Sequence, residues 1–162
     1  MRIFLNECSS KPLILKAPVD LSTFSIRDNP TLRKVISTNV EASVIESSDI
    51  IEIDVRMESE VELECAYTLE PFRKKLRLHD QLIFTFDKEN EDPNIFPING
   101  NYIDLDPYLF GLLLTEIPLK AIKPGAKLPK VGDGVRILSE EEYEAGRGKN
   151  NPFEGIKVEE DE

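Results

Sequence analysis

The feature that most constrains the fold is an alternation of apolar and acidic residues that runs from residue 51 to residue 65. Every odd position in this stretch is apolar except Ser59, and every even position is acidic except Arg56. Neighbouring side chains of a β-strand point to opposite faces, so a repeat of two over this length predicts one long strand, or two collinear strands. One face of that strand belongs to the core, and its other face is acidic and solvated.

A second strand is predicted from residue 72 to about residue 86, where the apolar residues fall on even positions. Between the first of them stand Arg73, Lys75, Arg77 and His79. If the two strands form a hairpin, their core faces coincide only when paired residue numbers have an odd sum. A sum near 137 is expected, because it sets basic residues opposite acidic ones at about 0.2 to 1 kcal/mol for each pair. The expected pairs are Glu64 with Arg73, Glu62 with Lys75, and Glu60 with Arg77.

A helix is predicted from about residue 104 to residue 117. Asp104 or Asp106 is expected to cap its start, Pro107 suits its first turn, and Pro118 should end it. A broad apolar face along this segment would pack against the sheet. That face comprises Leu105, Tyr108, Leu109, Leu112, Leu113 and Ile117.

The remaining segments are less regular. Residues 87–101 are rich in Asp, Asn, Glu, Pro and Gly, which predicts a loop or a mobile excursion. Residues 12–19 and 39–46 are predicted strands, and residues 30–36 are predicted to begin a short helix. Together these elements predict an α+β fold, in which a curved antiparallel β-sheet or partial barrel packs against one main helix in the C-terminal half.

Length and charge distribution predict one domain with an acidic appendage. Residues 1–138 are expected to form a single α+β domain, and residues 139–162, with nine acidic and three basic residues, an acidic and partly disordered C-terminal segment. No apolar run is long enough to span a bilayer, and the N-terminal residues become polar too soon for a signal peptide. We therefore expect a cytoplasmic location, no membrane partner, and Cys8 and Cys65 as thiols.

The sequence contains no recognisable catalytic motif or cofactor-binding motif. His79 is the single histidine, and no Ser or Cys nucleophile stands at a motif-like spacing from it. The glycines match neither the phosphate-loop pattern nor the dinucleotide-binding pattern, and two cysteines with one histidine are too few for a zinc site. We expect no catalytic residues, no cofactor and no metal, and we expect Cys65 to serve in packing.

Two basic features stand out against a net charge of −11, which argues against nonspecific nucleic-acid binding by the whole molecule. One is the predicted strand with Arg73, Lys75 and Arg77, and the other is an irregular loop at residues 120–136. The cations of that loop are Lys120, Lys123, Lys127, Lys130 and Arg136. Either feature can hold RNA phosphates or an acidic protein surface. The alternative is that the strand cations neutralise the acids of the neighbouring strand, while the loop lysines keep a surface soluble.

The segment VELECAYTLEPF at residues 61–72 resembles the YceD family, whose members carry a strand that ends in a cysteine, followed by a short turn and Pro-Phe. The capped helix that ends at Ile117-Pro118 and the segment Asn151-Pro152-Phe153 resemble two further family segments, in the same order. Thr68 stands where many members have a second cysteine, and the cysteines that some members carry after the helix are absent. The resemblance implies a bacterial and plastid family associated with accumulation of large-subunit ribosomal RNA, without a known reaction.

Three functions are compared on this basis. The leading hypothesis is a noncatalytic factor that supports large-subunit ribosomal RNA accumulation and ribosome assembly, by binding precursor rRNA or a ribosomal protein through the basic strand and loop. The alternative is a protein-binding adaptor whose acidic faces hold a basic client protein. An RNA-processing hydrolase ranks last, since no nucleophile, general base or metal cage is recognisable.

Overall fold

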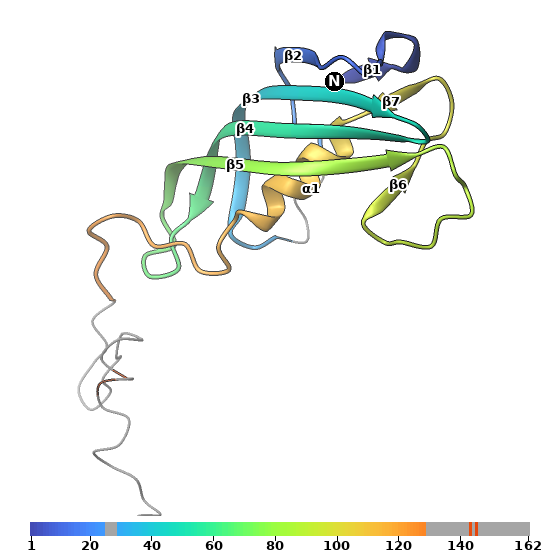
Figure 1. Ribbon diagram of the computed structural model, residues 1–162. Coiled ribbons are helices and arrows are strands. Elements are labelled where there is room, and N and C mark those ends of the chain that lie inside the picture. The colour runs from blue at the N-terminus through green and yellow to red at the C-terminus, as the bar shows by residue number, and fades with distance from the viewer. Residues whose placement is uncertain (25–28, 129–142, 144, 146–162) are drawn as a thin grey trace, which may run out of the picture.

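The computed structural model describes residues 1–24, 29–128, 143 and 145. In chain order the elements are β1 (Arg2–Phe4), the 3-10 helix η1 (Leu5–Glu7), β2 (Leu13–Pro18), β3 (Leu32–Ser47), β4 (Ile50–Glu64), β5 (Pro71–Thr85), β6 (Ile95–Pro97), β7 (Tyr102–Asp104) and α1 (Asp106–Thr115). Five strands form one open, curved sheet in the order β2-β3-β4-β5-β6, and β1 pairs with β7 in a second sheet (Figure 1). The predicted α+β class with a curved sheet is confirmed. Strands β2 to β5 are antiparallel, whereas the short β6 joins β5 in parallel, so the sheet is mixed.

The alternation at residues 51–65 forms β4, the central strand of the large sheet. Its odd residues from Ile51 to Leu63 are all buried, and its even residues lie on the opposite, outer face. Ser59, the exception in the apolar series, is buried as well, and its hydroxyl oxygen lies 3.0 Å from that of the buried Thr38 on β3. The two hydroxyl groups satisfy each other's hydrogen bonding, which explains how a polar residue fits on the core face.

The hairpin of β4 and β5 forms with the predicted parity but not with the predicted register. Glu64 faces Pro71, so paired residue numbers sum to 135 and every pair is shifted by two residues from the expected ladder. The cause lies in the turn, where the backbone N–H of Cys65 donates to the Glu70 carbonyl at 2.9 Å and that of Leu69 donates to the Cys65 carbonyl at 2.8 Å. These bonds close the loop within residues 65–70, and cross-strand ion pairs are too weak to open it.

The helix predicted at residues 30–36 is wrong, because residues 32–36 form the start of strand β3. The register of β3 against β4 shifts between Leu32 and Lys34 and again between Val35 and Ser37, with two residues of β3 facing one of β4 each time. Such β-bulges bend the strand. They also bring every third residue of this stretch to the core, so the buried positions repeat with a spacing that resembles one face of a helix. The strands predicted at residues 12–19 and 39–46 are present as β2 and as the second half of β3.

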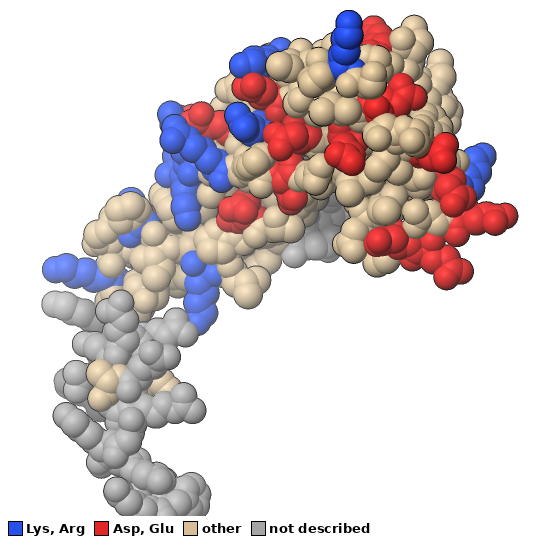
Figure 2. All heavy atoms as spheres, viewed as in Figure 1, with Lys and Arg blue, Asp and Glu red and all other residues tan. Residues whose placement is uncertain are grey.

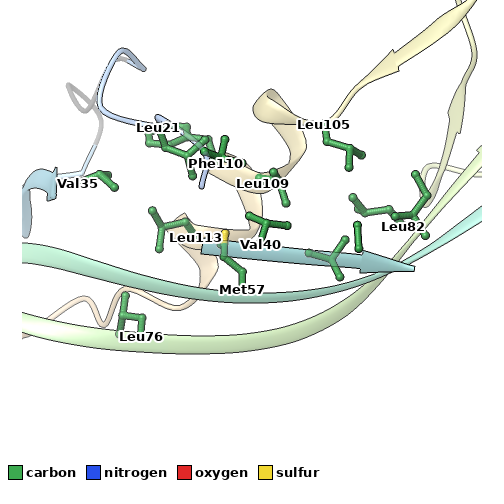
Figure 3. Packing of buried hydrophobic residues seen from close by; sticks show 14 of the residues in the cluster. Leu21, Val35, Val40, Met57, Leu76, Leu82, Leu105, Leu109, Phe110 and Leu113 are labelled. Atoms are coloured by element: carbon green, nitrogen blue, oxygen red, sulfur yellow. The ribbon is translucent and has the colours of Figure 1, made fainter. Parts of the chain in front are cut away.

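Helix α1 lies against the inner face of the large sheet and forms the core with it (Figure 1). Leu109 and Leu113 of the helix are fully buried, and Figure 3 shows them directed toward Val40 and Met57 of the sheet. The predicted capping is present only in part: Leu105, not an aspartate, is the N-cap residue, but the backbone N–H of Asp106 donates to the Asp104 carboxylate at 3.3 Å. The carboxylate of Asp106 instead contacts the amino group of Met1. No helix in the described part of the chain has the length and apolar character needed to cross a membrane.

The excursion at residues 87–101 contains a strand as well as a loop. Strand β6 pairs with residues 83–85 at the end of β5, and the ring of Phe96 in β6 lies 4.6 Å from that of Tyr108 in α1, measured between ring centroids. Phe84 packs edge-on against the same tyrosine at 5.0 Å. This aromatic cluster attaches the second half of the excursion to the core, while residues 87–92 form an exposed acidic loop.

Candidate functional site

The basic residues of β5 project from the first half of the strand, and β4 neutralises two of them. Arg77 lies 3.3 Å from a carboxylate oxygen of Glu58, and Arg73 lies 3.6 Å from one of Glu60. Both arginines are exposed, and exposed ion pairs contribute only about 0 to 1 kcal/mol. Lys75 faces Glu60 in the ladder, yet no described carboxylate lies within 4.0 Å of its amino group. Neutralisation by β4 therefore accounts for the two arginines, and Lys75 remains available.

Lys74 was missed as a candidate, because it occupies a position that the strand pattern assigns to the core. Its partner in the ladder is the buried Val61, so it projects on the helix side of the sheet, but it is exposed. The exposure follows from the sheet order, since β6 covers only residues 83–85 and leaves the first half of β5 as a free edge. A lysine that points inward at such an edge also prevents pairing with another strand, which is a purely structural reason for it.

Residues 120–128 form an irregular segment, as predicted, and hydrogen bonds hold it against the β4–β5 turn. The backbone N–H of Ala66 donates to the Ala121 carbonyl at 2.8 Å, and that of Lys123 donates to the sulfur of Cys65 at 3.4 Å. The amino group of Lys123 lies 3.0 Å from Glu70 of the same turn. These contacts neutralise Lys123 and place the segment beside the start of β5.

The structure thus brings most of the predicted cations to one end of the molecule. We call this surface the basic end; it comprises Arg73, Lys74, Lys75, Lys120, Lys123 and Lys127. Lys74, Lys75, Lys120 and Lys127 have no described carboxylate within 4.0 Å. Figure 2 shows Lys and Arg gathered over the start of β5 and the segment at residues 120–128. Lys130 and Arg136, also predicted here, lie outside the described residues.

Acidic residues gather at the opposite end, on the loop that precedes β6 (Figure 2). This loop carries Asp87, Glu89, Glu91 and Asp92, which are all exposed. The described part of the chain is therefore electrostatically polarised along β5. A negatively charged partner is attracted to one end and repelled from the other, so the charge distribution favours one orientation of approach.

A hollow of about 670 Å³ crosses the middle of β2 to β5. Its lining includes cations that are already paired, namely Lys16 with Glu41 at 2.9 Å and Arg77 with Glu58 at 3.3 Å. His79 lies beside it on β5, exposed, with its Nε2 atom 2.7 Å from Asp54. No group of three or more potential metal ligands occurs among the described residues. The described residues that line the hollow thus offer paired charges, and none of them is a nucleophile for the histidine.

Cys65 is buried at the end of β4, and its sulfur lies in a set of hydrogen-bond donors. The hydroxyl of Thr68 and the backbone N–H groups of Lys123, Thr68 and Tyr67 lower the pKa of the thiol from 9.0 to about 7, against the opposing effect of burial. The donors come from both the β4–β5 turn and the segment at residues 120–128. Cys65 therefore does more than fill the core: it links the two parts that build the basic end. Both cysteines are free.

This pKa makes the stability of the fold depend on pH. Because the thiol titrates lower in the folded chain than in the unfolded chain, its contribution is fully present above about pH 9 and is lost as the pH falls through about 7. The stability of the wild type relative to Cys65→Ala should thus increase between pH 6 and pH 9 in urea unfolding experiments. Thr68→Val should reduce the increase and Thr68→Ser should retain it. An equal difference between wild type and Cys65→Ala at both pH values would contradict this.

Comparison with known proteins identifies the family of this chain. The family model described as large ribosomal RNA subunit accumulation protein YceD matches residues 53–158, which include most of β4, all of β5 and α1, and the segment at residues 120–128. Searches of curated proteins and of solved structures found no significant match. The family match spans more than half of the 162 residues. The chain therefore belongs to the YceD family, whose description ties it to accumulation of large-subunit ribosomal RNA rather than to a reaction.

Proposed function

We propose that this protein supports large-subunit ribosomal RNA accumulation as a noncatalytic cytoplasmic factor that binds precursor RNA through its basic end. The observation that carries the proposal is that Lys74, Lys75, Lys120 and Lys127, without described acidic partners, lie on the start of β5 and on the segment held beside it, in an acidic molecule. Phosphate groups are the ligands that such a group of lysines attracts most strongly. The family description supplies the RNA class.

The rest of the molecule limits how RNA can bind. With a net charge of −11, most of its surface repels phosphate, so contact is confined to the basic end and binding depends on orientation. If four lysines contact phosphates of a single strand, the logarithm of affinity falls with the logarithm of salt concentration with a slope of about −3. Affinity should then fall by about 50-fold between 50 and 200 mM salt.

The chemistry of the described side chains supports a binding role. His79 is exposed on a strand and pairs with Asp54, and Cys65 is buried in the turn. No described residue beside either of them could act with it as nucleophile and base. Binding alone can favour accumulation of an RNA, since a bound chain protects it from nucleases or holds it in a conformation ready for assembly.

The experiment that tests this function is depletion of the protein from its native cell, followed by profiling of ribosomal subunits. Loss of large-subunit RNA relative to small-subunit RNA is expected, with recovery when the wild-type chain is restored. A variant with Lys120→Glu and Lys127→Glu should fail to restore it, while one with Lys11→Glu and Lys88→Glu should succeed. The two variants change the net charge equally, and no described residue pairs with any of the four lysines. Unchanged subunit levels after depletion would overturn the proposal.

One observation favours a second candidate, in which the protein holds a basic client such as a ribosomal protein. The exposed acidic loop at residues 87–92 is suited to a positively charged partner. In that case the variant with Asp87→Asn, Glu89→Gln, Glu91→Gln and Asp92→Asn should fail to restore the large subunit, and the variant with Lys120→Glu and Lys127→Glu should restore it. The two complementation results therefore separate RNA binding from client binding.

A further inference from the structure

We propose that the acidic C-terminal segment of this chain, residues 139–162, binds to the basic end of the same molecule and competes there with RNA. The binding itself is argued from the surface and from the sequence of the segment. The competition rests on the proposed function, in which the same surface binds RNA.

The basic end exposes aliphatic side chains as well as lysines. Leu119 is 96% exposed, Leu69 66% and Ile122 45%. Leu69 belongs to the β4–β5 turn, Ile122 belongs to the segment at residues 120–128 that hydrogen bonds hold against that turn, and Leu119 directly precedes this segment. Leu69 also has a φ of 58°, a conformation that residues other than glycine adopt at a steric cost. A large apolar side chain that is both strained and exposed is costly unless another surface covers it.

The nature of these side chains favours a polypeptide as the covering group. RNA bases stack on aromatic rings and on guanidinium planes, whereas leucine and isoleucine offer no flat π surface for stacking. A polypeptide with apolar side chains among acidic ones matches both components of the surface, because its acids pair with the lysines while its apolar groups cover the leucines.

Residues 139–162 have this composition. Nine acids stand against three bases, a net charge of −6, and the large apolar residues of the segment are Tyr143, Phe153, Ile156 and Val158. Residues 129–138 join this segment to the basic end, and a tether of ten residues reaches at most about 35 Å. Such a tether gives an effective concentration in the millimolar range, so even a weak contact is substantially populated.

Nuclear magnetic resonance tests the contact without RNA. Amide signals of Leu69, Lys74 and Leu119 should shift when Glu140, Glu141, Glu142 and Glu144 are all changed to Gln, because these changes release the segment. A matched variant with Asp87→Asn, Glu89→Gln, Glu91→Gln and Asp92→Asn, called the far-loop variant, removes the same number of charges from the acidic loop at residues 87–92. It should leave those signals in place. Leu119→Ser, at a position too exposed to affect folding, should reduce the shifts caused by releasing the segment. Unchanged signals in the first variant would overturn the proposal.

RNA binding provides the second readout. The variant with the four Glu→Gln changes should bind a single-stranded RNA about five- to tenfold more tightly than the wild type, and the far-loop variant less than twofold more tightly. A peptide of residues 139–162, added separately, should displace the RNA from the four-Gln variant. If the amide shifts occur and no variant binds RNA, the contact stands and the proposed function fails. If RNA binding tightens without amide shifts, the effect is general electrostatics and the contact is refuted.

Discussion

Changing Lys74, Lys75, Lys120 and Lys127 together to glutamate is expected to weaken binding to single-stranded RNA by about 100-fold or more near 0.1 M salt. Each lysine that contacts a phosphate releases counterions from the RNA, and each glutamate that replaces it adds repulsion. The salt dependence should change in parallel, from a slope of about −3 in the wild type to nearly zero in the variant. Fluorescence anisotropy with a labelled RNA at several salt concentrations measures both quantities.

A matched pair of variants separates local charge from net charge. Lys120→Glu with Lys127→Glu changes the basic end, and Lys11→Glu with Lys88→Glu makes the same charge change elsewhere on the exposed surface. The first pair should lose about tenfold in RNA affinity and the second about twofold or less. Equal losses in both pairs would mean that RNA responds only to the net charge, which contradicts a localised site. The melting temperatures should stay close to that of the wild type, since all four side chains are exposed.

Leu113→Asp is expected to unfold the domain. Leu113 is fully buried near the C-terminal end of α1, at the contact between the helix and the large sheet (Figure 3). The change removes a leucine from the core and places a carboxylate there without a partner, at a cost of more than about 4 kcal/mol. That is comparable with the whole stability of a typical domain, about 5 to 15 kcal/mol. Circular dichroism should show the loss of a cooperative thermal transition.

The control for this change lies on the same helix. Gly111 is exposed, and a Cβ atom added there meets no heavy atom within 4 Å. Gly111→Asp should therefore change the stability by less than about 1 kcal/mol, because aspartate tolerates a helix interior at least as well as glycine. If Leu113→Asp melts cooperatively at the temperature of Gly111→Asp, α1 does not form the core with the sheet as described.

The regular parts of the fold were predictable because their patterns reflect burial directly. The alternation at residues 51–65 fixed the position of β4 and the inner and outer faces of the sheet. The parity of the hairpin with β5 followed from the same pattern. The exact register could not be predicted in this way. Ion pairs worth a few tenths of a kcal/mol compete with the backbone hydrogen bonds of the turn, and the sequence does not reveal those bonds.

The errors at β3 and α1 have a common origin in local irregularity. Two bulges in β3 bring buried residues to every third position, so the period of two that identifies a strand is absent there. Likewise Asp106, which was predicted to cap α1, instead contacts the amino group of Met1, a residue that lies 105 positions away. Tertiary contacts of this kind override local propensity, and no window of sequence contains them.

Most basic residues of the candidate site were predictable from the sequence, but their proximity and their ion pairing were not. The basic residues of β5 and of residues 120–128 were identified, but their proximity depends on how Ala121 and Lys123 bond to the β4–β5 turn. Lys123 proved to be paired with Glu70, and Lys74 was overlooked because strand parity assigned it to the core. The signal that could have found Lys74 is the break in alternation at residues 73–75, three consecutive cations that suit a free sheet edge.

The most direct test of the central claim is ultraviolet crosslinking of the tagged protein to RNA in its native cell, with sequencing of the RNA and mapping of the crosslinked peptides. The account predicts enrichment of large-subunit precursor RNA over small-subunit RNA, with crosslinked peptides from the start of β5 and from residues 120–128. Crosslinks spread evenly over both ribosomal RNAs, or confined to surfaces other than the basic end, would contradict it.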